Sequence, residues 1–198
     1  MSESLHTRKT LIENVRKLKD DDSWEDFVHY YRAYIFAVIQ GMGLSNQEAE
    51  DLSQKVLLKL WKKLPDFEYR PGKCKFRTWL CTVIRNVVIS EIRSLSSRGK
   101  GYQKFKDNVD EEATFSLPEI EQLANQEWKA HIGKLAWENI KDSLSDKVIE
   151  AFLLFSEGVS TPEIAEKLNV EANTVNVYKK RVREKLLKEI NLLDSELG

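Results

Sequence analysis

The sequence predicts an all-α protein in which two small helical domains are joined by a flexible linker. Apolar residues recur every three or four positions along most of the 198 residues, a spacing that places them on one face of a helix. Sustained alternation of apolar and polar residues, which would favour strands, does not occur in the sequence. Between residues 96 and 117 the periodicity stops, and Ser, Gly and charged residues dominate. This composition is typical of a linker.

Four segments are therefore expected along the chain. They are an N-terminal helical extension at 1–23, a helical domain at 24–95, the linker at 96–125 and a second helical domain at 126–198. Hydrophobic residues make up 41% of the sequence and include five Trp. This content suffices for two packed cores.

The first helix of the N-terminal domain is expected to start at Ser23, because Asp26 three residues later completes a capping-box pattern. A shorter helix is expected before it, around residues 11–18. Gly41 and Gly43 predict where the first helix ends. Its expected core face consists of Phe27, Tyr31, Tyr34 and Val38.

A second capping box, formed by Ser45 and Glu48, predicts the next helix, which should end at Pro65. A loop at 65–75 and a further helix at about 76–95 complete this domain. The residues of the second helix expected to fill the core are Ala49, Leu52, Val56 and Leu60.

Helical periodicity returns after Pro118, and three shorter helices are expected at 146–156, 162–168 and 173–190. The last two have the organisation of a helix-turn-helix, with Ser160 or Thr161 capping the first helix and a tight turn at 169–172. An ordinary helical hairpin with a solvated basic face is the alternative interpretation. The residues expected to contact DNA are Thr161, Asn173, Thr174, Asn176, Lys180, Arg181 and Arg183.

Charge is distributed unevenly, although the net charge is only −1. Residues 55–106 carry 14 basic and 3 acidic side chains, whereas residues 107–138 carry 2 and 8. A basic block of this size indicates a polyanionic partner.

Within the basic block, aromatic and basic residues alternate between Lys62 and Arg93. Cations attract phosphates and aromatic rings stack on unpaired bases, so the pattern indicates contact with single-stranded or opened nucleic acid. The alternative is a hydrophobic core beside a solvated basic face, and Trp79 in particular fits either interpretation. The aromatic residues of the pattern are Phe67, Tyr69, Phe76 and Trp79, and the basic residues are Lys62, Lys63, Arg70, Lys73, Lys75, Arg77, Arg85 and Arg93.

Other classes of function find little support in the sequence. Neither a Gly-rich phosphate loop nor a catalytic or metal-ligand motif occurs, so we expect no enzyme activity, no metal site and no cofactor. The two cysteines, Cys74 and Cys81, imply no disulfide framework. Without an apolar span or secretory signal, we expect a cytoplasmic protein that does not insert into a membrane.

Three segments together resemble the bacterial RNA polymerase sigma factors, specifically the extracytoplasmic-function (ECF) group. The motif AEDLSQKVLLKLWKKL at 49–64 resembles the polymerase-binding helix of this family. FRTWLCTVIRNVVISEIR at 76–93 resembles its promoter-melting helix, and 160–188 resembles its upstream-element helix-turn-helix. The resemblance implies that core polymerase is bound by Asp51, Gln54, Leu58 and Trp61.

The resemblance also implies how promoter DNA is bound. The N-terminal domain would bind the minus-ten element, with the loop and helix at 66–93 holding the unpaired non-template strand. The resemblance implies that the residues in contact with this DNA are Phe67, Tyr69, Arg70, Lys73, Lys75, Arg77, Trp79, Arg85, Asn86 and Arg93. The C-terminal domain would bind the double-stranded minus-thirty-five element. The implied partners are core RNA polymerase, promoter DNA and an anti-sigma factor, and the protein is expected to be monomeric when free or bound one-to-one to core enzyme. A helix-turn-helix repressor or activator that acts on closed duplex DNA is the alternative function.

Overall fold

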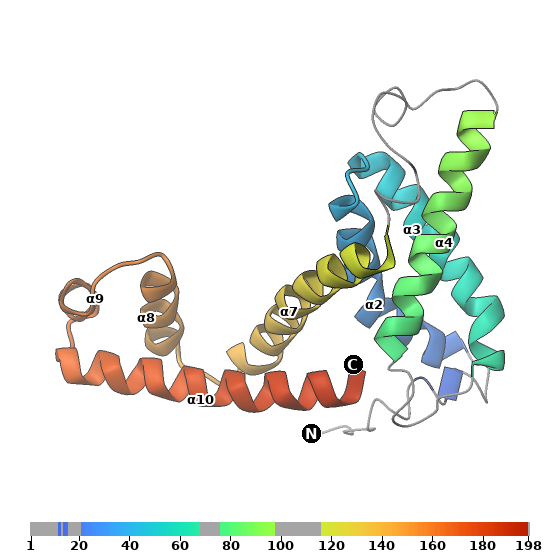
Figure 1. Cartoon of the computed structure of the whole chain (residues 1–198). Coiled ribbons are helices and arrows are strands. Elements are labelled where there is room, and N and C mark those ends of the chain that lie inside the picture. The colour runs from blue at the N-terminus through green and yellow to red at the C-terminus, as the bar shows by residue number, and fades with distance from the viewer. Residues whose placement is uncertain (1–11, 13, 16–20, 68–75, 98–115, 198) are drawn as a thin grey trace. The chain divides into compact units, whose positions relative to one another are not determined.

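The structure is a computed structural model that describes residues 12, 14–15, 21–67, 76–97 and 116–197. All regular elements in these ranges are helices (Figure 1), as the sequence predicted. They are α2 (Asp21–Gly41), α3 (Asn46–Lys63), the 3₁₀ helix η1 (Leu64–Asp66), α4 (Phe76–Ser97), α7 (Leu117–Lys141), α8 (Asp146–Ser156), α9 (Thr161–Leu168) and α10 (Ala172–Leu197). Among the described helices, none is long and apolar enough to span a membrane.

The chain forms two compact units. The first unit consists of residues 1–131 and 196–198, and the second consists of residues 132–195. Residues 117–131, the first part of α7, therefore belong to the first unit. From the sequence, these residues were divided between the linker and the second domain.

Helix α2 begins at Asp21, so the predicted cap at Ser23 is wrong. Asp21 and Asp22 form the first turn, where the positive end of the helix dipole favours carboxylates. These two aspartates favour a helix that starts two residues before Ser23. The end of the helix agrees with the prediction, because Gly41 is its last residue and Gly43 has a φ of +88° that favours glycine. The buried face includes all four predicted residues and contains Phe27, Tyr31, Tyr34, Ile35, Val38 and Ile39.

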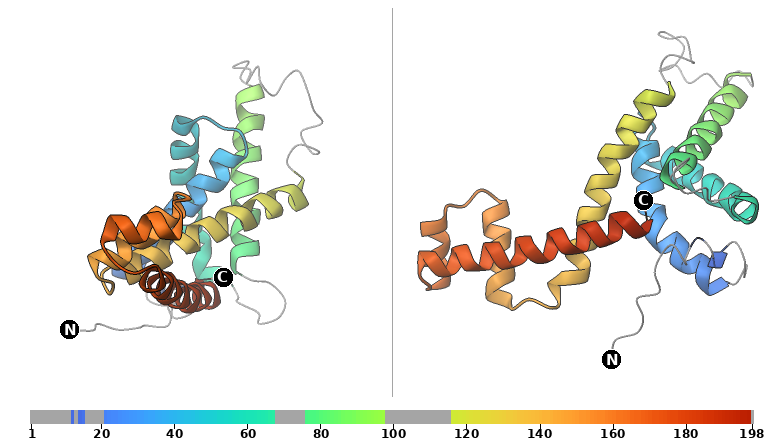
Figure 2. Two further views of the ribbon diagram at one scale, coloured as in Figure 1. Left: turned by 90° about the vertical axis from the view of Figure 1, so that its left-hand side faces the viewer. Right: turned by 60° about the horizontal axis from the view of Figure 1, so that its bottom comes forward.

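The capping box that starts α3 is confirmed. The Glu48 N–H donates to Ser45 Oγ at 3.4 Å, and the Ser45 N–H donates to Glu48 Oε2 at 2.8 Å. The predicted core residues Ala49, Leu52, Val56 and Leu60 are all buried. Helix α3 lies beside α2 and α4 (Figures 1 and 2), and burial of its apolar face holds the three helices together.

The first half of α7 is a fourth helix of the first unit. Ile120, Ala124 and Trp128 recur at every fourth position, and each is at most 3% exposed. The Tyr34 hydroxyl of α2 donates to the Ala124 carbonyl at 3.3 Å, and the His131 ring N–H donates to the Tyr30 carbonyl at 2.7 Å. These contacts fix residues 117–131 against α2.

The second unit contains the predicted helix-turn-helix, formed by α9 and α10. Ser160 is the residue that caps α9, since its backbone N–H donates to Glu163 Oε2 at 3.1 Å. Helix α10 continues to Leu197, seven residues past the predicted end, because no Gly or Pro interrupts 191–197. A core of Ala151, Ile164, Ala165, Leu168 and Val175 joins α8, α9 and α10.

Asn169 closes α9 in the left-handed backbone region, with φ 49° and ψ 58°. Replacing it with Val is expected to destabilise the second unit by about 1–2 kcal/mol, because a β-branched side chain is strained at positive φ. Gly at the same position should be tolerated, because glycine adopts this conformation without strain. Thermal unfolding of both variants followed by circular dichroism measures the difference, and equal melting temperatures would contradict the prediction.

Candidate functional site

The residues predicted to bind core polymerase lie on the face of α3 opposite its buried stripe. Asp51, Gln54 and Leu58 are exposed and follow a spacing of three and four residues, which places them on one side of the helix. Leu58 is 56% exposed, which is unusual for a leucine beside a well-packed core. Asp51, Gln54 and Leu58 form the α3 strip, in which an apolar side chain lies beside polar ones.

Trp61, the fourth predicted residue, lies one turn further along α3 and is half-buried. Its ring meets the edge of the Trp24 ring at a centroid distance of 4.9 Å. Trp24 in turn stacks on Phe27 in the core, with centroids 5.2 Å apart. Trp61 therefore connects the α3 strip to the packing of α2.

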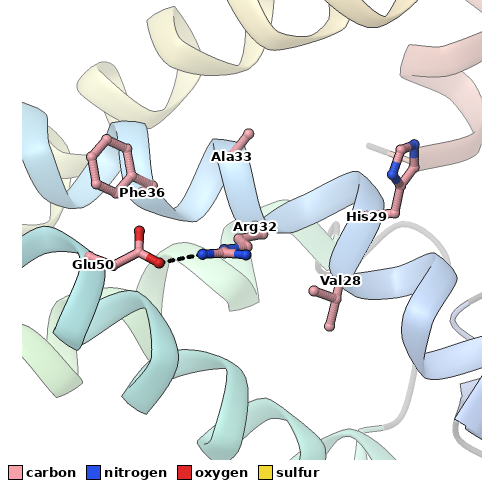
Figure 3. Close-up of a pocket in the computed structure, with 6 residues that line it drawn as sticks. All are labelled: Val28, His29, Arg32, Ala33, Phe36 and Glu50. Carbon is pink, nitrogen blue, oxygen red and sulfur yellow. Dashed lines mark hydrogen bonds and ion pairs between the residues drawn. The ribbon is translucent and has the colours of Figure 1, made fainter.

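A pocket of about 450 Å³ lies between α2 and α3, near the start of the α3 strip. Figure 3 shows Arg32 of α2 reaching toward Glu50 of α3, with which it forms an ion pair. Sequence reasoning missed this pair, because its members are 18 residues apart and carry no shared motif. The residues that line the pocket are Val28, His29, Arg32, Ala33, Phe36 and Glu50.

Helix α4 carries the described part of the predicted promoter-melting set. Asn86 and Arg93 are exposed, whereas Arg77 and Arg85 are half-buried. Trp79 is half-buried as well. Four predicted residues, Tyr69, Arg70, Lys73 and Lys75, lie outside the described residues.

The aromatic residues of this region form a cluster at the start of α4. Phe67 is only 8% exposed, and its ring centroid lies 4.5 Å from that of Trp79 and 5.7 Å from that of Phe76. The Phe67 ring is thus part of the packing beneath the surface. Trp79 combines both interpretations, because it joins this cluster while keeping an accessible part.

Arg77 makes a contact that the sequence did not predict. Its guanidinium lies 5.2 Å from the centroid of the Trp128 ring, a cation–π geometry. Trp128 belongs to the first half of α7 and is 2% exposed. A predicted DNA-contacting cation is therefore held by a residue about fifty positions further along the chain.

The residues predicted to contact the minus-thirty-five element are displayed mainly by α10. Asn173, Asn176, Lys180, Arg181 and Arg183 are exposed. Thr161 and Thr174 are half-buried. The opposite face of α10 is packed, with Val175 and Val182 fully buried. Short polar groups near the start of the helix and cations further along suit base-edge and phosphate contacts, respectively.

A pocket of about 360 Å³ between α8 and α10 brings three of these residues together. Asn176, Lys180 and Arg183 share its wall with Lys179, which sequence reasoning missed. Lys179 Nζ lies 3.7 Å from the centroid of the Phe155 ring and donates to Thr161 Oγ1 at 3.2 Å. No sequence signal identifies Lys179, because its role depends on two other helices. In the described ranges, we find no group of His, Cys, Asp and Glu side chains that could hold a metal ion.

Comparison with known proteins gives matches for both units. Residues 27–98 match the sigma-70 region 2 family, and residues 142–188 match the bacterial regulatory proteins of the luxR family. Among curated proteins, the ECF RNA polymerase sigma factor SigW of Bacillus subtilis (strain 168) is 24% identical over 190 residues, covering 92% of this chain and 96% of SigW. A solved structure of CnrH in complex with the cytosolic domain of CnrY covers 96% of this chain and 99% of that chain, with 20% identity and a TM-score of 0.38.

The order of the two matched domains agrees with the geometry described above. The region 2 match contains α3 and α4, with their exposed strip and their cationic residues. The luxR-type match contains the helix-turn-helix. Together with a relative matched almost from end to end, they show a sigma-70 region 2 domain followed by a luxR-type helix-turn-helix domain, in a chain homologous to an extracytoplasmic-function RNA polymerase sigma factor.

Proposed function

We propose that this sigma factor divides its work among three surfaces, one that binds core RNA polymerase, one that holds opened promoter DNA and one that reads the upstream duplex. The observation that carries this division is the placement of Leu58. It is the most exposed of the large hydrophobic residues in the described chain, yet it lies on a helix whose other face is packed. An exposed apolar anchor among polar residues is typical of a protein interface.

Core polymerase would bind the α3 strip of Asp51, Gln54 and Leu58, with Trp61 at its end. The apolar side chains would supply most of the binding free energy, because anchor residues at the centre of an interface dominate affinity. The polar side chains would fix the orientation of the partner. An anti-sigma factor that covered Leu58 would keep the protein from polymerase.

The unpaired non-template strand would bind along α4. Arg77, Arg85 and Arg93 would attract its phosphates, and Asn86 would hydrogen-bond to a base or the backbone. The predicted contribution of Tyr69, Arg70, Lys73 and Lys75 in the preceding loop remains part of this proposal. Because Phe67 is buried, we assign it the role of supporting Trp79 rather than stacking on a base.

The upstream duplex would bind α10, with Asn173, Thr174 and Asn176 toward base edges and Lys180, Arg181 and Arg183 toward phosphates. Lys179 would position Thr161 through its hydrogen bond. Recognition helices of helix-turn-helix proteins contact base edges with their N-terminal residues. The polar residues of α10 lie at that end.

Energetics require that the protein act with polymerase. Opening a dozen base pairs loses about 1.4 kcal/mol of stacking per step, whereas each base captured on an aromatic ring returns about 1–3 kcal/mol. One or two captured bases cannot balance this loss. Polymerase contacts must supply the remainder, and we place the protein in the cytoplasm, as a monomer that binds core enzyme one-to-one.

Run-off transcription with core polymerase on a library of genomic fragments tests the proposal. We expect promoter-specific transcripts only when the protein is present. Arg77→Ala or Asn86→Ala should preserve binding to core polymerase and reduce promoter opening, measured by permanganate reactivity of unpaired thymines, by about tenfold. If the protein instead bound closed duplex specifically and directed no transcript, it would be a repressor or activator and the proposal would fail.

A further inference from the structure

We propose that Trp128 competes with the promoter strand for Arg77, and that residues 117–131 leave α2 and α4 when the strand binds. In the free protein, this first half of α7 would mask part of the strand-binding surface. The inference rests on the proposed function of α4 and adds a regulatory contact within the chain itself.

The surroundings of Trp128 resemble those that proteins offer to an unpaired base. Its indole is flat, 2% exposed, and stacks at 23° on the ring of Tyr31 with centroids 6.4 Å apart. The Tyr34 ring meets it edge-on at 5.1 Å, and Arg77 covers it at 5.2 Å. Aromatic rings and an arginine are the groups that bind single-stranded nucleic acid by stacking and cation–π contact. The face of Arg77 that covers the indole cannot also receive a base.

Carboxylates of α7 lie at the same surface. Burial raises the pKa of the Cys81 thiol on α4 to about 11, the carboxylate of Glu121 adds to the rise, and Arg85 opposes it. Burial also raises the pKa of Tyr34, with Glu127 adding to the rise and Arg77 opposing it. Negative charges of α7 thus lie where α4 presents the cations predicted to attract phosphates.

Chain length shows why the docked helix must leave during initiation. Elements near minus ten and minus thirty-five are about 25 base pairs apart, or roughly 85 Å at about 3.4 Å per pair. Beyond Trp128, α7 continues for only about 20 Å at about 1.5 Å per residue. The second unit, residues 132–195, is about 40 Å in its longest dimension, because α10 has 26 residues and rises about 1.5 Å per residue. With Trp128 on Arg77, covalent connection therefore limits the recognition helix to within about 65 Å of Arg77, which is too short to reach the upstream element.

Release of α7 removes this limit. Residues 98–115 can span at most about 60 Å when extended, at about 3.3 Å per residue, and α7 itself adds length once it is free of α2. The docked and promoter-bound arrangements therefore exclude each other by covalent geometry. Docking of residues 117–131 would lower the affinity of the free protein for DNA. Core polymerase would favour their release, because it holds the binding sites of the two units apart.

Fluorescence anisotropy of the full chain with a labelled 20-nucleotide strand tests the competition, using the non-template minus-ten region of a promoter found by run-off transcription. Trp128→Leu should bind this strand about five- to twentyfold more tightly than the wild type, which corresponds to loss of one cation–π competitor. Unchanged or weaker binding by a folded Trp128→Leu protein would overturn the proposal. Trp137→Leu is the matched control, because Trp137 stacks on Phe152 in the second unit at 5.0 Å and should leave strand affinity unchanged.

A second variant, in α2, should disrupt the same contact between Trp128 and Arg77. A Cβ at Gly41 would lie 2.7 Å from a methyl carbon of Leu123, and the ring of Gly41→Phe is larger than a rotation of the Leu123 side chain can accommodate, so this variant should push α7 away while leaving Trp128 and Arg77 intact. We expect the same gain in strand affinity from this variant, so it tests the competition even if Trp128→Leu does not fold. Arg77→Ala distinguishes the proposed strand-binding role of α4 from the proposed competition by Trp128. If it impairs promoter opening while neither release variant gains affinity, the role of Arg77 stands and the competition fails.

Hydrogen exchange of the wild-type protein gives a readout that needs no substitution. Amides of residues 120–131 should exchange at least tenfold faster in the complex with core polymerase and promoter than in the free protein, because their contacts with α2 and α4 are lost. Equal or slower exchange in the complex would show that α7 remains docked, and the proposal would be wrong.

Discussion

Leu58→Asp is expected to weaken binding to core polymerase by about 100-fold, the size of effect typical of a hot-spot residue at an interface centre. Leu58 is 56% exposed, so a carboxylate there loses little internal packing. In the complex, the same carboxylate would be buried without a partner. Titration of labelled protein with core polymerase, read by anisotropy, measures the dissociation constant.

The control for this prediction is Leu187→Asp. Leu187 is 50% exposed on α10, in the second unit, so the substitution has the same chemistry and nearly the same exposure. It should leave core affinity within about twofold, since surface substitutions outside an interface have small effects. Equal losses for the two variants would mean that added charge, rather than the α3 strip, explains the defect.

The sequence was informative wherever structure depends on neighbouring residues. The Ser45 capping box and the buried stripe of α3 were predicted correctly, because a cap and an amphipathic face are both set within a few turns of helix. The helix-turn-helix was predicted for the same reason, including the turn at Asn169. The exposed position of Leu58 follows directly from these patterns.

Contacts between distant segments could not be predicted in this way. Trp128 and Arg77 are 51 positions apart, and the periodicity of α7 shows that Trp128 is buried without showing against what. The same holds for Lys179, whose partners Phe155 and Thr161 come from the end of α8 and the start of α9. The false cap at Ser23 is a different error. Ser23 and Asp26 have the spacing of a capping box, but the helix already starts at Asp21 and Asp22.

Arg181→Ala is expected to weaken binding of the polymerase complex to promoter DNA that contains the upstream element. The loss should be about tenfold at moderate salt, because one phosphate contact and its released counterion are removed. Arg181 is exposed on α10, while Val182 beside it is fully buried, so the substitution removes a charge without disturbing the core. Competition binding at several salt concentrations measures both the affinity and its salt dependence.

The salt dependence distinguishes a phosphate contact from base recognition. Arg181→Ala should lower the slope of log affinity against log salt by about one and should weaken binding to all upstream sequences alike. Asn173→Ala should leave that slope unchanged and reduce discrimination between sequences, because an asparagine carries no charge and recognises base edges. Lys167→Ala, an exposed lysine of α9 outside the proposed contacts, should change neither quantity. If Arg181→Ala altered sequence preference with an unchanged slope, Arg181 would be a base-contacting residue, and α10 would lie in the groove with a different face toward the bases.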